Sequence, residues 1–414
     1  MATPALPQGT RGQRSVKAGA AAAAPAAAAT LAQGVLRDGQ AEARLMAVYQ
    51  LVAAGRSREA LAQAESLARD YPNFQLAQLA VGDLLMSRTR PVPIPRTQGA
   101  GPPVADGGTG LQATTTLEEL RTEWRQRVEA QHSRPPAHSV PTQFLELSTR
   151  SRHAIAVDAS RSRLYLFENT SKGLQLVADY YASVGKLGIE KAIEGDQRTP
   201  LGVYFITSRL DPATLKDFYG AGALPINYPN PLDQRRGKTG SGIWLHGTPP
   251  DQFSRAPLAT DGCLALANPD LERILRAVEP RSTPVVIARQ LQWVQPHSIQ
   301  AERTSFDAVL NAWRNAKTQG DMKRLLGFYA PDFQGYRQKP LNEWSQVLEA
   351  ETRALKGREL HLKDKSYLRW TDSADTMVVT FGEVAEGART GPIKRQYWTR
   401  RGQQWQIFFE GVIG

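Results

Sequence analysis

One stretch of the sequence, residues 244–267, reads WLHGTPPDQFSRAPLATDGCLALA and contains the only cysteine of the 414-residue chain. His246-Gly247 ends an apolar run that is typical of a strand, and Cys263 follows 17 residues later in Thr260-Asp261-Gly262-Cys263. A helix is predicted from Pro269 to Val278. We expect unpaired N–H groups and the helix dipole to favour a thiolate at the cysteine that precedes it.

Cys263 and His246 together meet the minimum requirement for nucleophilic acyl transfer, because a histidine at a strand end can reach a cysteine at a loop–helix junction. The N–H groups of Asp261, Gly262 and Cys263 are candidate donors to an oxyanion. Gly262 allows the backbone to turn tightly beside the sulfur. The alternative interpretation is a structural histidine and a cysteine that serves as a small buried hydrophobe.

A second motif, Thr199-Pro200-Leu201-Gly202-Val203-Tyr204, lies on a predicted strand upstream. Together with His246-Gly247 and Thr260-Asp261-Gly262-Cys263, in this order, it resembles the signature of the L,D-transpeptidase family with its YkuD-type catalytic domain. The resemblance covers roughly residues 152–290 and implies a mostly-β domain that acts on peptidoglycan stem peptides.

The resemblance also implies roles. Cys263 would attack the carbonyl of the bond between the diamino acid and D-Ala, His246 would carry the proton to the departing amine, and the Gly247 carbonyl would orient the imidazole. Transfer of the acyl group from the thioester to an amine is transpeptidation. Transfer to water makes the enzyme an L,D-carboxypeptidase, or an amidase that releases wall-attached protein. No metal or organic cofactor is expected.

Two positions depart from the family pattern. Asp261 stands where many members have His, and its charge should oppose thiolate formation. Ala265 stands where many have Arg, a plausible partner for a substrate carboxylate, which leaves donor and acceptor preferences open. The candidate substrate-binding residues are Thr260, Trp244, Tyr228, Arg235 and Arg236.

The chain outside this region predicts a multidomain protein. The predicted parts are a leader or disordered tail at 1–34, a helical segment at 35–88, a Pro/Gly linker at 89–115, a catalytic domain with a leading helix at 116–294, and a C-terminal α+β domain at 298–414. The first part has the order of a weak secretory signal. Apolar periodicity in the segment 35–88 predicts helices. Within it, residues 51–73 resemble one tetratricopeptide (TPR) repeat, with a plain helical hairpin as the alternative.

The C-terminal region places helices before strands, which is an α+β pattern. It resembles an NTF2-like or SnoaL-like cone, in which most of the aromatic residues are expected to be core. A YkuD-type domain followed by an NTF2-like domain also resembles the cell-shape L,D-carboxypeptidases of helical bacteria. This pairing favours hydrolysis and implies that the C-terminal and helical parts dock wall glycan or a protein partner.

Composition limits the remaining classes. The chain has 51 Lys and Arg against 40 Asp and Glu, a net charge of +11, which favours an anionic environment. No Lys/Arg-dense helix or RNA-binding aromatic signature occurs, so nucleic acid is not an expected partner. No apolar run reaches the roughly 18 residues of a transmembrane helix. We expect export to the periplasm or cell envelope, and we keep a non-catalytic wall-binding scaffold as the alternative of another class.

Overall fold

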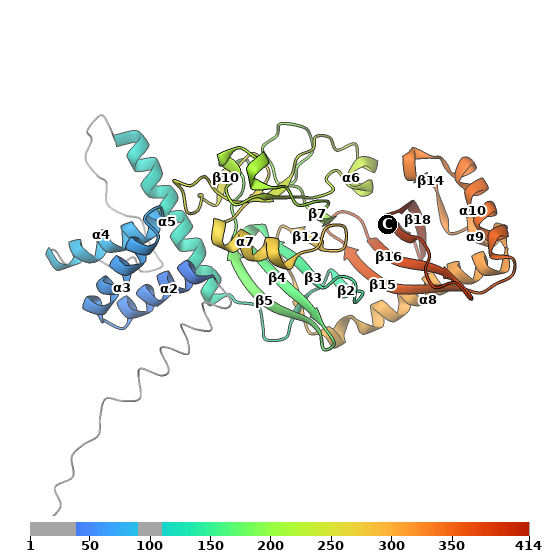
Figure 1. Ribbon diagram of the computed structural model, residues 1–414, viewed down its shortest axis with the longest axis horizontal. Helices are drawn as coiled ribbons and strands as arrows, with labels where there is room; N and C mark the ends of the chain where they lie inside the picture. The colour runs from blue at the N-terminus through green and yellow to red at the C-terminus, as the bar shows by residue number, and fades with distance from the viewer. Residues whose placement is uncertain (1–38, 90–109, 414) are drawn as a thin grey trace, which may run out of the picture.

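A computed structural model describes residues 39–89 and 110–413, which form three parts in a row (Figure 1). Helices form one end, a β-rich part the middle, and an α+β part the other end. The predicted leader at 1–34 and residues 90–109 of the predicted linker lie outside the described residues. No described helix combines the length and apolar character needed to cross a membrane.

The helical part has the helices that the apolar periodicity of the sequence predicts. Its helices are α2 (Gln40–Ala53), α3 (Ser57–Asp70), α4 (Gln75–Thr89) and α5 (Gly110–His132). Gly55 separates α2 from α3 with φ of +72°, a conformation that glycine adopts without steric cost. The linker was predicted to extend to residue 115, but its last six residues already belong to α5.

The middle part contains a mixed sheet with the order β5-β4-β3-β12-β7. Its strands are β5 (Gly173–Tyr181), β4 (Arg163–Thr170), β3 (His153–Asp158), β12 (Pro284–Ala288) and β7 (Gly202–Phe205). A smaller sheet with the order β11-β9-β8 consists of β11 (Leu264–Ala265), β9 (Trp244–His246) and β8 (Ala223–Pro225). The remaining elements are β10 (Leu258–Thr260), paired with β6 (Val184–Gly185), and helices α6 (Pro231–Arg235) and α7 (Asn268–Ala277).

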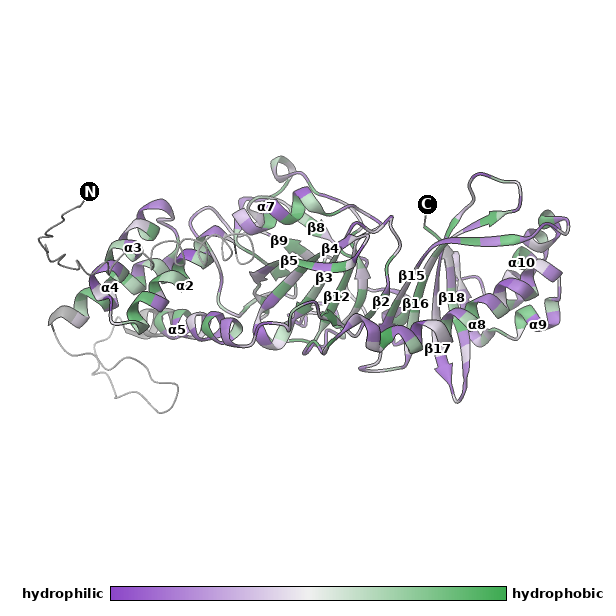
Figure 2. Ribbon diagram, turned by 90° about the horizontal axis from the view of Figure 1, so that it is seen from below, coloured by the Kyte–Doolittle hydropathy of each residue, from purple (hydrophilic) through white to green (hydrophobic). Residues whose placement is uncertain are grey.

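Both faces of the larger sheet are buried against apolar cores, and its strands carry many hydrophobic residues, coloured green in the middle of Figure 2. Because successive side chains of a strand point to opposite faces, Ile155 and Val157 enter one core and Ala154 and Ala156 enter another. The first core also contains the α7 side chains and holds the smaller sheet in place. The second core is shared with the C-terminal part.

The C-terminal part is built on a sheet with the order β14-β18-β17-β16-β15-β2. Its strands are β14 (Tyr329–Gly335), β18 (Gln404–Val412), β17 (Ile393–Arg401), β16 (Thr376–Ala385), β15 (Leu360–Trp370) and β2 (Phe144–Glu146), and its helices are α8 (Gln300–Gln319), α9 (Met322–Leu326) and α10 (Leu341–Leu355). Most of its aromatic residues are core, as predicted, whereas Tyr336 is exposed.

Strand β2 joins the middle and C-terminal parts. It precedes the catalytic region in the chain, yet it pairs with β15, with Leu368 opposite Phe144 and Tyr367 opposite Glu146. A short pair of β1 (Val140–Pro141) and β13 (Trp293–Val294) ties the start of the middle part to its end. The apolar cluster across the junction combines Phe144, Phe205 and Leu232 with Leu368, Trp370, Tyr397 and Phe408.

Candidate active site

The smaller sheet brings the two motif halves together. Strands β9 and β11 are parallel, with Leu264 beside Leu245 and Ala265 beside His246. Cys263 therefore lies next to Trp244, whose backbone N–H donates to Sγ at 3.4 Å. The thiol lies 3.4 Å from the Gly242 carbonyl oxygen, which it can donate to as a weak donor. The register of two short strands thus places the sulfur at the strand that ends in His246.

The sulfur is not at a helix N-terminus, in contrast to the prediction from the sequence. Helix α7 begins at Asn268, and β11 intervenes between it and Cys263. Burial raises the pKa of the Cys263 thiol, while the Trp244 N–H and the nearby Arg255 oppose that rise. The expectation of a resting thiolate was therefore wrong, because desolvation outweighs the local donors.

The imidazole of His246 is buried, with 1% of the residue exposed. Its Nδ1 lies 2.7 Å from the Gly247 carbonyl oxygen. That carbonyl can only accept, so Nδ1 carries the proton and Nε2 is left as the base. Burial lowers the pKa of His246 to about 4, against the opposing effect of the Gly247 hydrogen bond. At neutral pH the site therefore holds a thiol and a neutral imidazole.

Aromatic rings surround the imidazole. Tyr219 meets it edge-on with ring centroids 5.2 Å apart, and the Tyr219 ring also lies 4.9 Å from that of Trp244. Phe218 lies 5.9 Å from His246 and is 44% exposed. The base is thus shielded by protein on its tyrosine side, and an exposed apolar ring adjoins it.

The turn before the sulfur is fixed by threonines. Thr260 Oγ1 donates to the Cys263 carbonyl at 2.7 Å and accepts from the Gly262 N–H at 3.1 Å. Thr199, from the upstream motif, donates to the Gly262 carbonyl at 3.0 Å. Gly262 has φ of +119°, and a Cβ there would lie 2.7 Å from the Arg198 carbonyl oxygen. Thr260 therefore acts within the turn, and only glycine fits at 262.

Two of the three candidate oxyanion donors remain uncommitted. The Gly262 N–H is taken by Thr260, while the N–H groups of Asp261 and Cys263 have no hydrogen-bond partner among the described residues. The Asp261 side chain is 67% exposed and pairs with Lys186 at 3.0 Å. It also accepts from Gln197 at 3.0 Å. Its carboxylate is thus directed to the neighbouring loop, and its backbone N–H remains available.

Arg255 is a site residue that the sequence reasoning missed. It lies in the loop between β9 and β10, and its guanidinium stacks 4.2 Å over the Phe218 ring. Its Nε is buried and has no hydrogen-bond partner. Its positive charge lowers the pKa of both Cys263 and His246, which places it close to both. No sequence signal pointed to Arg255, because Ala265, where many family members have Arg, only left the donor and acceptor preferences open.

The other candidate residues divide into two groups. Trp244 and Thr260 lie at the sulfur. Tyr228 is buried and donates to the Thr239 carbonyl at 3.1 Å. Arg235 pairs with Asp332 at 2.9 Å and Arg236 bonds Ser373, so both arginines contact the C-terminal part. The structure therefore does not bring Arg235 or Arg236 to Cys263, because α6 packs against the other domain. No group of metal-binding side chains occurs among the described residues.

Comparison with known proteins gives two domain matches. Residues 152–287 match the YkuD model, the L,D-transpeptidase catalytic domain, and residues 305–411 match the Cds6 C-terminal NTF2-like domain. No curated protein matches the chain in a sequence search.

Solved structures with a similar fold extend over both domains. Bd1075 of Bdellovibrio bacteriovorus is 25% identical with a TM-score of 0.57, covering 66% of this chain and 98% of its own. The helical cell shape determining protein Pgp2 of Campylobacter jejuni is 21% identical with a TM-score of 0.51, covering 65% of this chain and 95% of its own.

Proposed function

The chain carries a YkuD-type L,D-transpeptidase catalytic domain followed by an NTF2-like domain, and on this premise we propose that it cleaves peptidoglycan stem peptides through a Cys263 thioester. The observation that carries the proposal is the arrangement around Cys263: a thiol beside β9, and a buried imidazole on the same strand whose Nδ1 is held by Gly247. A thiol nucleophile and a neutral base to take its proton are what an attack on a peptide carbonyl requires.

Acylation proceeds with a balanced transfer of one proton. Cys263 Sγ attacks the carbonyl carbon of the diamino acid–D-Ala bond as His246 Nε2 takes the thiol proton. The carbonyl oxygen becomes an oxyanion, which the Asp261 and Cys263 N–H groups stabilise. The C–N bond then breaks, the imidazolium gives its proton to the departing D-Ala amine, and a thioester remains.

We assign water as the acyl acceptor, which makes the enzyme an L,D-carboxypeptidase. The support is the pairing of a YkuD-type domain with an NTF2-like domain, which resembles the pairing in the cell-shape L,D-carboxypeptidases of helical bacteria. Pgp2, named as a helical cell shape determining protein, is a solved structure with a similar fold. In the deacylation step the water oxygen attacks the thioester carbonyl carbon as His246 Nε2 takes a proton from that water. The C–S bond then breaks, the imidazolium returns the proton to the sulfur, and the stem peptide leaves with a new terminal carboxyl group. A stem-peptide amine as acceptor, which is transpeptidation, is the second candidate, because it is the reaction after which the matched catalytic family is named.

Arg255 supplies the anion contact that Ala265 lacks. Its guanidinium has an unpartnered Nε beside the reacting pair, and guanidinium–carboxylate pairing is strong and directional. We assign it to the terminal carboxylate of the stem peptide, and Phe218 to the adjacent apolar wall. Because the substrate is murein, the proposed location is the periplasm or cell envelope.

Product analysis tests this proposal. Incubation with disaccharide tetrapeptide is expected to release D-Ala and leave the tripeptide, as followed by mass spectrometry. A crosslinked dimer would instead establish the transpeptidase. Because the chain has one cysteine, an acyl-enzyme adduct or a carbapenem adduct maps to a single site.

Variants separate catalysis from docking. Cys263→Ala and His246→Gln are expected to abolish product, while His297→Gln, a change at an exposed histidine, serves as the matched control. Full activity in Cys263→Ala, or a cell-shape phenotype that this variant leaves intact, would favour the wall-binding scaffold.

A further inference from the structure

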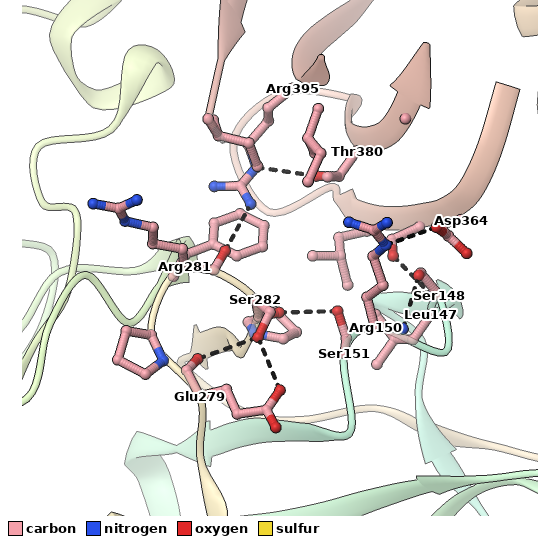
Figure 3. A pocket seen from close by; sticks show the side chains of 18 residues that line it. Leu147, Ser148, Arg150, Ser151, Glu279, Arg281, Ser282, Asp364, Thr380 and Arg395 are labelled. Carbon is pink, nitrogen blue, oxygen red and sulfur yellow. Dashed lines mark hydrogen bonds and ion pairs between the residues drawn. The ribbon is translucent and has the colours of Figure 1, made fainter. Parts of the chain in front are cut away.

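A pocket of about 320 Å³ lies at the seam between the catalytic and NTF2-like domains (Figure 3). We name it the seam pocket. Its walls come from the segment before β3, the turn between α7 and β12, and strands β15, β16 and β17. None of its lining residues belongs to the site around Cys263.

Arg395 of β17 is the buried cation of this pocket. The residue is 7% exposed, and its guanidinium stacks 3.2 Å over the Phe205 ring of the catalytic domain. Its Nε donates to Thr380 Oγ1 at 3.0 Å, and Nη2 makes a long contact of 3.4 Å with the Arg281 carbonyl oxygen. Figure 3 shows the guanidinium directed across the seam toward that carbonyl. The Nη1 group has no hydrogen-bond partner among the residues that the structure describes.

Arg395 differs from the other buried cations in lacking an ion pair among the described residues. Each of the others has a carboxylate partner within 3.2 Å: Arg127, Arg163, Lys191, Lys317 and Lys394. A buried charge without a counterion is costly, since desolvation is not compensated. Burial lowers the pKa of Arg395 to about 10 and leaves it protonated at neutral pH.

The remaining charges of the seam pocket do not neutralise Arg395. Asp364 pairs with Arg150 at 2.7 Å. Glu279 accepts from Ser282 at 3.4 Å and lies 3.9 Å from Arg152. Three lining arginines (150, 281 and 395) face two lining acids, Glu279 and Asp364, which leaves a net charge of +1.

We propose that the seam pocket binds a small aliphatic carboxylate, with the guanidinium of Arg395 as its anchor. The remaining walls suit such a ligand, because they supply both aliphatic side chains and hydroxyl groups. The aliphatic walls are Leu147, Leu368, Ile393 and Pro284, and the hydroxyls are Ser148, Ser151, Ser366 and Thr380. A guanidinium binds a carboxylate through two parallel N–H···O bonds, and an aliphatic wall fits a short apolar group beside it.

Such a ligand would contact both domains at once and therefore stabilise their junction by mass action. Ligand binding in the seam pocket does not depend on the cysteine chemistry. A failure of the binding proposal can therefore be told apart from a failure of the proposed reaction. N-acetyl-D-alanine and D-alanine are the probes, the first lacking the amine charge of the second. They distinguish a chain-terminal carboxylate from a free amino acid as the source.

The test is calorimetric titration and thermal unfolding of the full chain in the Cys263→Ala, Arg255→Gln background, which removes carboxylate binding at the active site. We expect saturable binding of N-acetyl-D-alanine and a ligand-dependent rise in Tm. Arg395→Gln should weaken binding by at least about tenfold and should itself raise Tm without ligand, since an uncompensated buried charge is removed. Arg400→Gln, a change at an exposed arginine of the same strand, should alter neither.

A second variant keeps the proposal testable if Arg395→Gln fails to fold. Gly382 lines the seam pocket, and a Cβ there meets only the Lys363 carbonyl oxygen at 3.7 Å. Gly382→Val should fold and block binding. Binding unchanged in both variants, absence of saturable binding, or equal affinity for inorganic phosphate would overturn the proposal. Tighter binding of N-acetyl-D-alanine than of D-alanine would assign a chain-terminal carboxylate, and the reverse a free amino acid.

Discussion

At the scale of the residue, burial decides the protonation of the reacting pair. The Cys263 thiol has a raised pKa and the His246 imidazole a lowered one. Both shifts favour the uncharged partners over a thiolate–imidazolium pair, because desolvation penalises each charged form. In the proposed mechanism, proton transfer from sulfur to Nε2 therefore accompanies attack on the substrate instead of preceding it.

The first prediction concerns pH. His246 has a pKa of about 4, so the acid limb of kcat/KM for D-Ala release should fall near pH 4 instead of near the ordinary value of about 6.5. Unfolded protein binds the proton below about 6.5 and folded protein only below about 4. The folded state should therefore lose on the order of 3 kcal/mol as the pH falls through that window.

Measurement of Tm at several pH values in the wild type and in His246→Gln checks this stability term, which the variant should lack. An acid limb of the activity profile at pH 6.5 would contradict the buried neutral base.

The second prediction concerns Arg255. Arg255→Gln should raise KM by about tenfold or more, since a charge-assisted carboxylate contact is lost, and should lower kcat less. It should also slow iodoacetamide labelling of Cys263, because the guanidinium lowers the thiol pKa. Arg276→Gln is the matched control, as Arg276 is exposed on α7. An unchanged KM would remove Arg255 from substrate binding.

At the scale of the element, the helical part holds the loop that carries Arg255. Phe253 in this loop packs 4.2 Å from the Phe74 ring and edge-on against Tyr71 at 5.5 Å. The Phe253 N–H donates to the Asn73 carbonyl at 3.1 Å. The Arg255 carbonyl accepts from Tyr181 at 2.8 Å on the catalytic side. The turn between α3 and α4 and strand β5 thus fix the loop from two sides.

The third prediction follows from this contact. Phe74→Ala should cost about 3–5 kcal/mol of packing, lower kcat/KM several-fold and make the loop more accessible to proteolysis. Leu85→Ala, at a leucine of α4 that is 46% exposed, should leave the stability, kcat/KM and the proteolysis of the loop unchanged. Normal kcat/KM in folded Phe74→Ala would show that the helical part does not position the loop.

At the scale of the whole molecule, the catalytic and C-terminal domains share one apolar core. Phe144, Phe205 and Leu232 pack with Trp370 and Phe408, and β2 needs β15 as its partner. Across the same junction Arg235 pairs with Asp332 and stacks 4.6 Å from the Phe408 ring. At the other end, Glu42 of α2 pairs with buried Arg163 of β4 at 2.7 Å. The order of the parts is thus maintained by buried contacts at both junctions.

The fourth prediction is that a chain ending at residue 297 unfolds at lower temperature than the full chain and binds a hydrophobic dye. The reason is that loss of the C-terminal part exposes one side of the shared core. Arg401→Ala in the full chain is the control and should cost no more than about 1 kcal/mol, because Arg401 makes an exposed ion pair with Asp332. A shortened chain with the Tm of the full chain would refute the shared core.

Much of the fold could be predicted because its signals are local. Apolar periodicity marked the helical segment that contains α2, α3 and α4, and the α+β character of the C-terminal part was also predicted. The boundaries of α5 and the pairing of β2 could not be predicted, since a three-residue strand has almost no pattern of its own. Its partner, β15, is more than 200 residues away in the chain.

What the sequence by itself determined is the chemistry: one sulfur, a His-Gly pair, and a Gly at 262 that the backbone geometry requires. Residue type and spacing carry that information because nucleophile, base and turn are each defined by covalent structure. The tertiary structure alone decided the ionisation of the pair, the arrival of Arg255 beside it and the diversion of Arg235 and Arg236 to the other domain. Those outcomes depend on desolvation and on contacts between distant segments, and neither is encoded in any single stretch of the chain.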